Sequence, residues 1–187
     1  MLPRLRRELS SLRSTVNPKF AFCNLLVCLL PCYALAGVRA ELYRSAGCQL
    51  ARGVTIQGPL VLLGAGPATR RLRVDRGSII APFVTFVLDA RVAIGRNVSI
   101  GPSAAFHTAT HNIGFGSRRM QLVTEAHPIT IEDGAWIGAH SVVLPGVTVG
   151  QGSVVGAGSV VAESVPANVF VAGNPATVRE HLPFGNR

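Results

Sequence analysis

Three of the five histidines in this sequence lie close together, and histidine is the side chain best suited to move protons at neutral pH. His107, His111 and His127 fall within one polar segment. An imidazole with an ordinary pKa of about 6.5 can take a proton from a weak nucleophile, and it is also the commonest ligand of metal ions. No serine or cysteine stands in a pattern that pairs a nucleophile with a base. The cluster therefore predicts general-base catalysis by a histidine, with a zinc site as the alternative.

The four cysteines do not point to a metal or disulfide site. They stand at positions 23, 28, 32 and 48 without a CxxC pair, and three of them lie in an apolar stretch. A free cysteine in such a place behaves as a small hydrophobic residue. We expect all four to be reduced packing residues.

The histidine cluster interrupts a repeat of six residues. On its C-terminal side each repeat opens with an aliphatic residue and has a small or modest fifth residue. The opening residues are Ile131, Ile137, Val143, Val149, Val155 and Val161. Upstream the period continues through Leu88, Ile94, Ile100 and Phe106, and in a shifted phase through Val74, Ile80 and Phe86. Val54 and Ile56 indicate an earlier, less regular repeat.

A period of six predicts a parallel β-helix, because an amphipathic helix repeats every ~3.6 residues and a strand every ~2. Each hexapeptide would form a short strand and a turn, and three would form a triangular coil of about eighteen residues. The aliphatic residues would stack inside from coil to coil. We therefore expect a mainly β domain over residues 49–187. The interruption at residues 107–128, and a smaller one at Gly64–Arg73, would be loops outside the coils, where function concentrates.

Residues 1–48 have a different character. Leu2, Leu5, Leu9 and Leu12 beside an Arg-rich face predict an amphipathic helix, ended by Pro18. Residues 20–38 carry no charge and reach the threshold length for a membrane span, but Pro31 divides them. The pattern favours a helical hairpin inserted in a membrane, or an interfacial helix. A full span, a helix pair packed on the protein or on a sister subunit, and a signal peptide cut after Ala34-Leu35-Ala36 stay open.

The amino-acid composition limits the kinds of molecule that this protein is expected to bind. The net charge is +9, from 18 Lys and Arg against nine acidic residues, which predicts a partner that carries phosphates or an acidic membrane surface. Neither an RNA-binding aromatic pattern nor a DNA-reading helix is present, so nucleic acid is not expected. Charged residues are only 14% and apolar residues 48% of the chain, which excludes a disordered protein.

The most specific motifs surround the histidine cluster. They are Thr108-Ala109-Thr110-His111, residues 128–138, residues 142–150 and the closing run Val171-Ala172-Gly173-Asn174-Pro175-Ala176. From Val74 to about Arg179 the chain resembles the hexapeptide-repeat acyltransferases, and most of all the maltose, galactoside and exopolysaccharide (colanic-acid type) O-acetyltransferases. The resemblance implies a left-handed parallel β-helix and a homotrimer with active sites between neighbouring subunits. It also implies transfer of acetyl from acetyl-CoA, as co-substrate, to a sugar hydroxyl.

The resemblance also suggests roles for individual residues. His111 matches the catalytic base of that family, which acts in a direct attack of the hydroxyl on the thioester. Asp89 matches a residue that contacts the acceptor, although Asp is also ordinary at its place in the repeat. Trp136 and His107 are expected beside the acceptor. Small side chains for the coenzyme A groove, and one arginine for its phosphates, are Gly138, Ala139, Ala157, Ala162 and Arg179.

Two details of this family resemblance refine what we expect of a metal site and of the acceptor. The γ-type carbonic anhydrases share the β-helix and bind zinc through histidines, one pair of which has four residues between them. Here three residues separate His107 from His111, so no metal is expected. Where the sugar acetyltransferases carry an Asn upstream, this chain has Ala81-Pro82-Phe83-Val84, and Glu163 stands where relatives often have Lys. A larger or more apolar acceptor than a free sugar is favoured.

Together the two parts predict an enzyme at a membrane. Acetyl-CoA is cytosolic, and basic segments stay on the cytoplasmic side of membranes. We expect a trimeric O-acetyltransferase held by residues 1–40 on the cytoplasmic face of the bacterial inner membrane, acting on a sugar or lipid-linked glycan precursor. The alternatives are a xenobiotic (antibiotic) acetyltransferase on the same scaffold and a non-catalytic, membrane-anchored β-helix scaffold.

Overall fold

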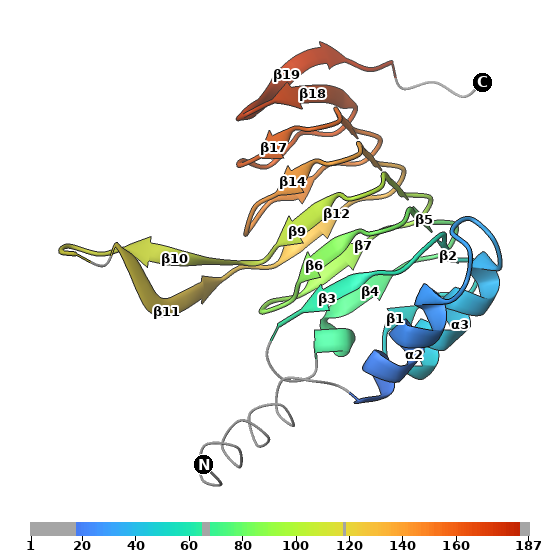
Figure 1. Cartoon of the computed structure of the whole chain (residues 1–187). Helices are drawn as coiled ribbons and strands as arrows, with labels where there is room; N and C mark the ends of the chain where they lie inside the picture. The colour runs from blue at the N-terminus through green and yellow to red at the C-terminus, as the bar shows by residue number, and fades with distance from the viewer. Residues whose placement is uncertain (1–17, 65–67, 118, 184–187) are drawn as a thin grey trace, which may run out of the picture.

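The computed structural model describes residues 18–64, 68–117 and 119–183, and the chain winds upward from two helices through a solenoid (Figure 1). The predicted amphipathic helix near the N-terminus lies outside the described residues. The predicted mainly β solenoid is confirmed, with about six turns.

Short strands in the described residues form three parallel sheets, one on each side of the solenoid. The first sheet contains β1 (Gln49–Leu50), β4 (Leu72–Val74), β7 (Val92–Ile94), β12 (Ile129–Ile131) and β15 (Thr148–Val149). The second contains β2 (Thr55–Ile56), β5 (Ile79–Ile80), β8 (Ser99–Ile100), β13 (Trp136–Ile137), β16 (Val154–Val155), β18 (Val169–Gly173) and the antiparallel β19 (Ala176–His181). The third contains β3 (Val61–Leu63), β6 (Thr85–Val87), β9 (Ala105–His107), β14 (Val142–Val143) and β17 (Val160–Val161). A 3-10 helix, η1 (Ala68–Arg71), occupies part of the smaller predicted break.

The repeat residues stack in register inside the solenoid, as their spacing predicts. In the first sheet Ile131 pairs with Ile94 below and Val149 above, and all three are buried. In the third sheet the rings of Phe86 and Phe106 stack with centroids 4.9 Å apart. Burying one such side chain stabilises a fold by ~1.5–3 kcal/mol relative to leaving it exposed. The stack of apolar residues therefore holds each coil to the next.

The predicted loop at residues 107–128 is an antiparallel β-hairpin, not an irregular segment. It consists of β10 (Ala109–Ile113) and β11 (Met120–Ala126), which project from the body (Figure 1). The chain leaves the third sheet after β9 and re-enters the first sheet at β12, whose Ile129 pairs directly with Val92 of the preceding coil. The hairpin is therefore inserted at the corner between the third and first sheets without breaking the stacking of coils.

Two helices pack against the first coil. They are α2 (Pro18–Cys28) and α3 (Ala36–Ser45). Pro18 is the first residue of α2, where its missing N–H costs nothing. Tyr43 of α3 is fully buried; its hydroxyl donates to Asn24 Oδ1 (2.6 Å) and accepts from the Leu60 amide (2.9 Å). The helix pair thus shares its core with the solenoid. No helix among the described residues is long and apolar enough to span a membrane.

The cysteines divide into two buried and two exposed residues, so the expectation that all four pack inside is wrong for Cys28 and Cys32. Cys23 faces α3, and burial raises the pKa of the Cys48 thiol to about 12. Cys28 is the last residue of α2 and Cys32 lies in the turn beyond it, and both side chains are exposed. The helix packing therefore protects only half of the thiols.

We predict that a water-soluble thiol reagent at neutral pH modifies Cys28 and Cys32 rapidly in the folded protein and the other two only on unfolding. Only the thiolate reacts, and a buried thiol is not accessible to the reagent; the raised pKa of Cys48 also keeps that thiol protonated. The thiols can be counted by absorbance before and after adding denaturant. Fast modification of Cys48 in the native protein would contradict the packing of the helix pair.

Candidate functional site

A buried threonine anchors the root of the hairpin. The Thr108 side chain donates a hydrogen bond to the Val87 carbonyl (2.7 Å) and accepts one from the Ala90 amide (2.9 Å), and the residue is fully buried. Its carbonyl accepts a hydrogen bond from the His127 amide at 2.8 Å. Both ends of the hairpin are therefore tied together and to the coil below, which fixes the direction in which it leaves the solenoid.

His111 lies on the exposed first strand of this hairpin. It pairs with Thr124 of β11, and the register shifts between His111 and Ile113, as at a β-bulge. Beside it the Asn112 amide donates to Glu125 Oε1 at 2.6 Å, linking the two strands. Bulges re-aim side chains and are common next to active sites. The imidazole is thus carried on an ordered arm and open to a ligand.

Two of the predicted acceptor residues lie near the hairpin root. Asp89 stands in the turn between β6 and β7, next to the alanine whose amide binds Thr108. His107 ends β9 and pairs with Val87. Both are half-buried. The structure therefore brings Asp89 and His107 to the third–first corner. Among the described residues, no three His, Cys, Asp or Glu side chains are grouped so that they could hold a metal ion.

Three small residues stack at a different corner, between the second and third sheets. A Cβ on Gly138 would lie only 2.5 Å from the Ala157 backbone nitrogen in the next coil. The Gly158 amide donates to the Ala139 carbonyl at 2.8 Å. Gly138 is buried where the two coils pack closely, while Ala139 is half-buried and Ala157 exposed, so a ligand could reach this corner past small side chains. We call Gly138, Ala139 and Ala157 the small-residue column.

Two further predicted residues adjoin this column. Trp136 precedes it on β13 and is 56% exposed on the outer side of the second sheet. Arg179 on β19 donates from Nε to the Ala172 carbonyl (3.3 Å). Ala172 lies directly above Gly156, because a Cβ there would be 3.0 Å from the Ala172 Cβ. The guanidinium therefore stands at the C-terminal end of the same corner.

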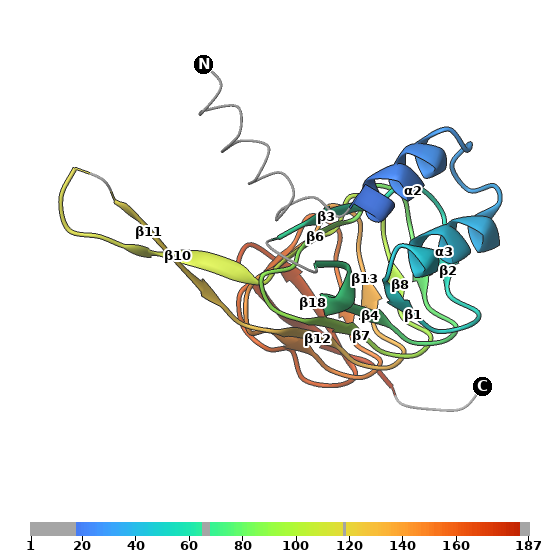
Figure 2. The same cartoon turned by 90° about the horizontal axis from the view of Figure 1, so that it is seen from below.

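The structure does not bring all the predicted site residues together within one chain. Ala162 follows β17 and lies at the opposite end of that strand from Ala157. More importantly, the hairpin with His111 leaves from the third–first corner, whereas the small-residue column lies at the second–third corner (Figure 2). A single chain thus presents the predicted base and the small-residue column on different sides, whereas Ala162 lies at the corner of the hairpin.

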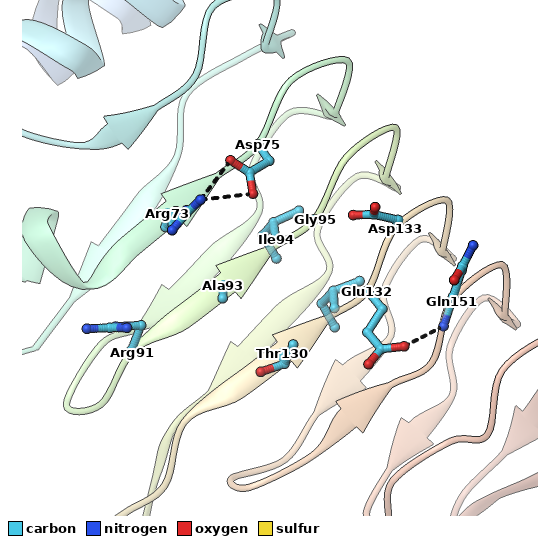
Figure 3. A pocket seen from close by; sticks show the side chains of 11 residues that line it. Arg73, Asp75, Arg91, Ala93, Ile94, Gly95, Thr130, Glu132, Asp133 and Gln151 are labelled. Atoms are coloured by element: carbon cyan, nitrogen blue, oxygen red, sulfur yellow. Dashed lines mark hydrogen bonds and ion pairs between the residues drawn. The ribbon is translucent and has the colours of Figure 1, made fainter.

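The structure also has a polar groove that sequence analysis does not predict. It measures about 510 Å³ and lies on the first sheet, between Arg73 and Arg91 on one side and Glu132 and Gln151 on the other (Figure 3). Two of its carboxylates already have partners. Glu132 Oε2 accepts a hydrogen bond from the backbone amide of Gln151 at 2.9 Å, and Asp75 forms an ion pair with Arg73. None of the predicted site residues lines it. The groove offers no free base for chemistry.

Another of its carboxylates, Asp133, ties two coils together. It accepts from the Arg96 amide at 2.7 Å and from the Arg96 guanidinium, and these bonds lower the pKa of the carboxyl. Because this pair lies on an outer turn, the six-residue pattern of buried residues does not predict it.

Thr108 is the positioning residue that sequence analysis missed, since it was noted only as part of a motif. We predict that Thr108→Val lowers kcat for transfer without raising KM for acetyl-CoA, because the Ala90 amide loses its partner and the hairpin root loosens. An unsatisfied buried amide costs ~1–3 kcal/mol. Thr108→Ser keeps the hydroxyl and should restore both kcat and thermal stability. Equal activity of the valine and serine variants would contradict this role.

Comparison with known proteins agrees with this geometry. Residues 128–163 match the family described as bacterial transferase hexapeptide (six repeats). A hexapeptide-repeat-containing acetyltransferase from Vibrio cholerae, solved with acetyl coenzyme A, is 32% identical, with a TM-score of 0.75 over 88% of this chain and 86% of its own. The galactoside O-acetyltransferase of Escherichia coli is 42% identical over 95 residues, which cover 51% of this chain and 46% of its own.

A second galactoside O-acetyltransferase, from Lactococcus lactis, is 36% identical over 99 residues, covering 53% of this chain and 47% of its own. The chain spans about half the length of the curated relatives it matches. The match to the Vibrio structure extends over most of both chains. The family predicted from the motifs is thus confirmed: the chain belongs to the hexapeptide-repeat acetyltransferases and has galactoside O-acetyltransferases among its relatives.

Proposed function

We propose that this protein is an acetyl-CoA-dependent O-acetyltransferase whose active sites form between the subunits of a homotrimer. One observation carries the proposal: the hairpin that bears His111 and the small-residue column lie at different corners of the same chain. Each half of a site is present, but only a second copy can supply the other half. Closed rings of identical subunits arise when such unlike surfaces meet.

The exposed side chains of the hairpin support this assembly. Ile113, Phe115, Leu122 and Val123 are between 71% and 101% exposed. An arm of this kind, with apolar residues on both strands, is costly to leave in water and suits the surface of a neighbouring subunit. In the trimer the arm of one subunit would lie over the column of the next, so that His111 faces the bound coenzyme.

The chemistry follows from these positions. The His111 imidazole takes the proton of the acceptor hydroxyl as its oxygen attacks the thioester carbonyl of acetyl-CoA. The tetrahedral intermediate collapses and expels the coenzyme A thiolate, which receives the proton back from the imidazolium. No acyl-enzyme forms, because the hydroxyl attacks the thioester directly. The column would hold the pantetheine chain against the backbone, and Arg179 at its end would meet a phosphate.

The acceptor is a hydroxyl of a sugar, as the names of the galactoside relatives suggest. Asp89 and His107 at the hairpin root would orient it, with Trp136 from the facing subunit. Phe83 is 53% exposed, so the part of the surface where relatives hold the sugar with an amide is apolar here. This supports a lipid-linked glycan precursor over a free sugar.

Subunit mixing tests the shared site directly. His111→Ala removes the base, and Ala157→Arg blocks the column at an exposed position; each variant alone should be inactive. If sites are shared, unfolding the two together and refolding them should restore about a quarter of wild-type activity, because some interfaces join an intact arm to an intact column. Transfer is measured as labelled acetyl moved from acetyl-CoA to a sugar or a membrane extract.

The controls separate assembly from catalysis. Each variant refolded alone should stay inactive while remaining trimeric by sedimentation. If the mixed trimers recover no transfer activity, the proposal that subunits share each site is refuted. A wild-type protein that binds acetyl-CoA but labels no acceptor would leave the fold intact and refute the enzyme assignment for the acceptors tried.

A further inference from the structure

The net charge of the chain is concentrated in the N-terminal part of the sequence. Twelve of the 18 basic residues and three of the nine acidic residues precede Gly77, so the first 76 residues carry the entire net charge of +9. In the rest of the chain, positive and negative side chains are equal in number. In the described part these cations belong to the helix pair and the first coils, among them Lys19, Arg52 and Arg70, all exposed. The N-terminal end therefore presents a cationic surface.

The same end carries an unusually apolar surface. Helix α2 buries Cys23 against α3 and Val27 in the core, yet Phe22 and Leu25 on its other side, and Leu29 just beyond its end, are 61–74% exposed. A helix that is apolar on both sides needs a partner on both. The turn that follows adds the exposed side chains of Tyr33 and Leu35, and the first turn of α3 adds Val38. Residues 20–38 contain no charged side chain at all. We call residues 29–35 the tip.

A buried arginine satisfies three carbonyls of the tip from within. Arg39 is fully buried and donates to the carbonyls of Leu30, Pro31 and Ala34. The Tyr33 amide donates to the Gln57 carbonyl of the first coil at 2.7 Å. Tip carbonyls that would otherwise need water thus have donors, while the side chains around them are apolar. Backbone groups satisfied in this way are the requirement for a segment that enters lipid without spanning it.

We propose that the helix pair and its tip dock on an anionic lipid surface, with the apolar tip in the headgroup–acyl boundary and the surrounding cations on the headgroups. Apolar side chains together with neighbouring Lys and Arg are the two components of interfacial binding. The inference goes beyond the proposed acetyl transfer and does not depend on it.

The charge distribution favours lipid over a second copy of the chain as the occupant. Two such ends brought together would repel, because each carries the whole surplus of positive charge. The tip also lies on the side away from the β10–β11 hairpin in both views (Figures 1 and 2). Docking there leaves the predicted subunit contact and His111 free.

Vesicle sedimentation of the full-length protein tests the proposal. We expect binding to vesicles of equal parts phosphatidylcholine and phosphatidylglycerol, and much weaker binding to phosphatidylcholine alone. Leu29→Glu should weaken binding by about tenfold or more, because burial of a leucine is worth ~1.5–3 kcal/mol and ~1.4 kcal/mol is tenfold. Val178→Glu, an equal change at the exposed far end of the solenoid, should bind like the wild type.

Thiol protection supplies an independent readout in the same samples. Cys28 precedes the tip and Cys32 lies within it, and both are exposed in the free protein. Anionic vesicles should slow their modification by a water-soluble reagent, and phosphatidylcholine vesicles should not. Unchanged thiol reactivity, or equal binding by the Leu29→Glu and Val178→Glu variants, would overturn the proposal. So would a vesicle-free wild type that self-associates through this face and is dispersed by Leu29→Glu.

Discussion

Replacing His111 by alanine is expected to lower the rate of acetyl transfer by ~10²–10⁴-fold while leaving the affinity for acetyl-CoA nearly unchanged. The hydroxyl must lose its proton as it attacks, and no other exposed imidazole is carried on β10. The small-residue column, by contrast, is built from backbone at another corner and does not involve this side chain. The loss should therefore appear in kcat. Steady-state kinetics and equilibrium binding of acetyl-CoA measure the two quantities separately.

A second histidine of the interruption at residues 107–128 provides the matched control. His127 is exposed at the root of the hairpin, just after β11, and its backbone amide makes the bond to the Thr108 carbonyl. His127→Ala keeps that bond and should retain nearly full activity. Equal losses in both variants would mean that the hairpin, and not the base, had been damaged. Rapid quench of the wild type should trap no acyl-enzyme, since direct attack forms none.

The solenoid could be predicted from the sequence because its core repeats. Every sixth residue must be aliphatic to fill the interior, and Ile131, Ile137 and Val143 occupy buried positions for that reason. The same period puts Ala139 and Ala157 in register one coil apart. Such regularities are visible in one chain without an alignment, since each coil contacts only its neighbours.

The hairpin and the helix pair could not be predicted in detail, because both lack a one-sided burial pattern. All seven residues of β11 are exposed, so no alternation distinguishes a strand from a loop. Helix α2 is apolar on the side that packs and on the side that does not, so the sequence could not decide between a membrane and a protein neighbour. The role of Thr108 depends on where a turn of another coil, at Val87 and Ala90, happens to lie.

The sequence also could not show that the predicted site residues are divided between two corners of the solenoid. Ala157 and Ala162 are five residues apart, and in a coil of three short strands that distance carries the chain from one end of β17 to the other. The motif names the residues but not the side of the solenoid on which each falls. Only the three-dimensional register separates the His111 arm from the column, and this separation is what requires a neighbouring subunit.

Gly138→Ala is expected to lower the free energy of unfolding by about 3 kcal/mol, at the upper end of the cost of overpacking. The added Cβ would lie 2.5 Å from the Ala157 nitrogen and 2.6 Å from the Val155 oxygen, and both are backbone atoms that cannot turn aside. The two coils must therefore separate, which weakens the bond from the Gly138 amide to the Val155 carbonyl (2.8 Å). For a chain of this size the melting temperature should fall by ~6–12 °C.

Gly158→Ala at the same corner distinguishes this clash from the mere loss of a glycine. Nothing lies within 4 Å of a Cβ placed there, and the only penalty is its left-handed φ of +69°, which costs ~1 kcal/mol. Thermal melts of both variants, with and without acetyl-CoA, give the comparison. Since the coenzyme should lie against this column, it should raise the melting temperature of Gly158→Ala by more than that of Gly138→Ala. Equal melting temperatures for the two variants would mean that the coils are not packed as closely as these distances require.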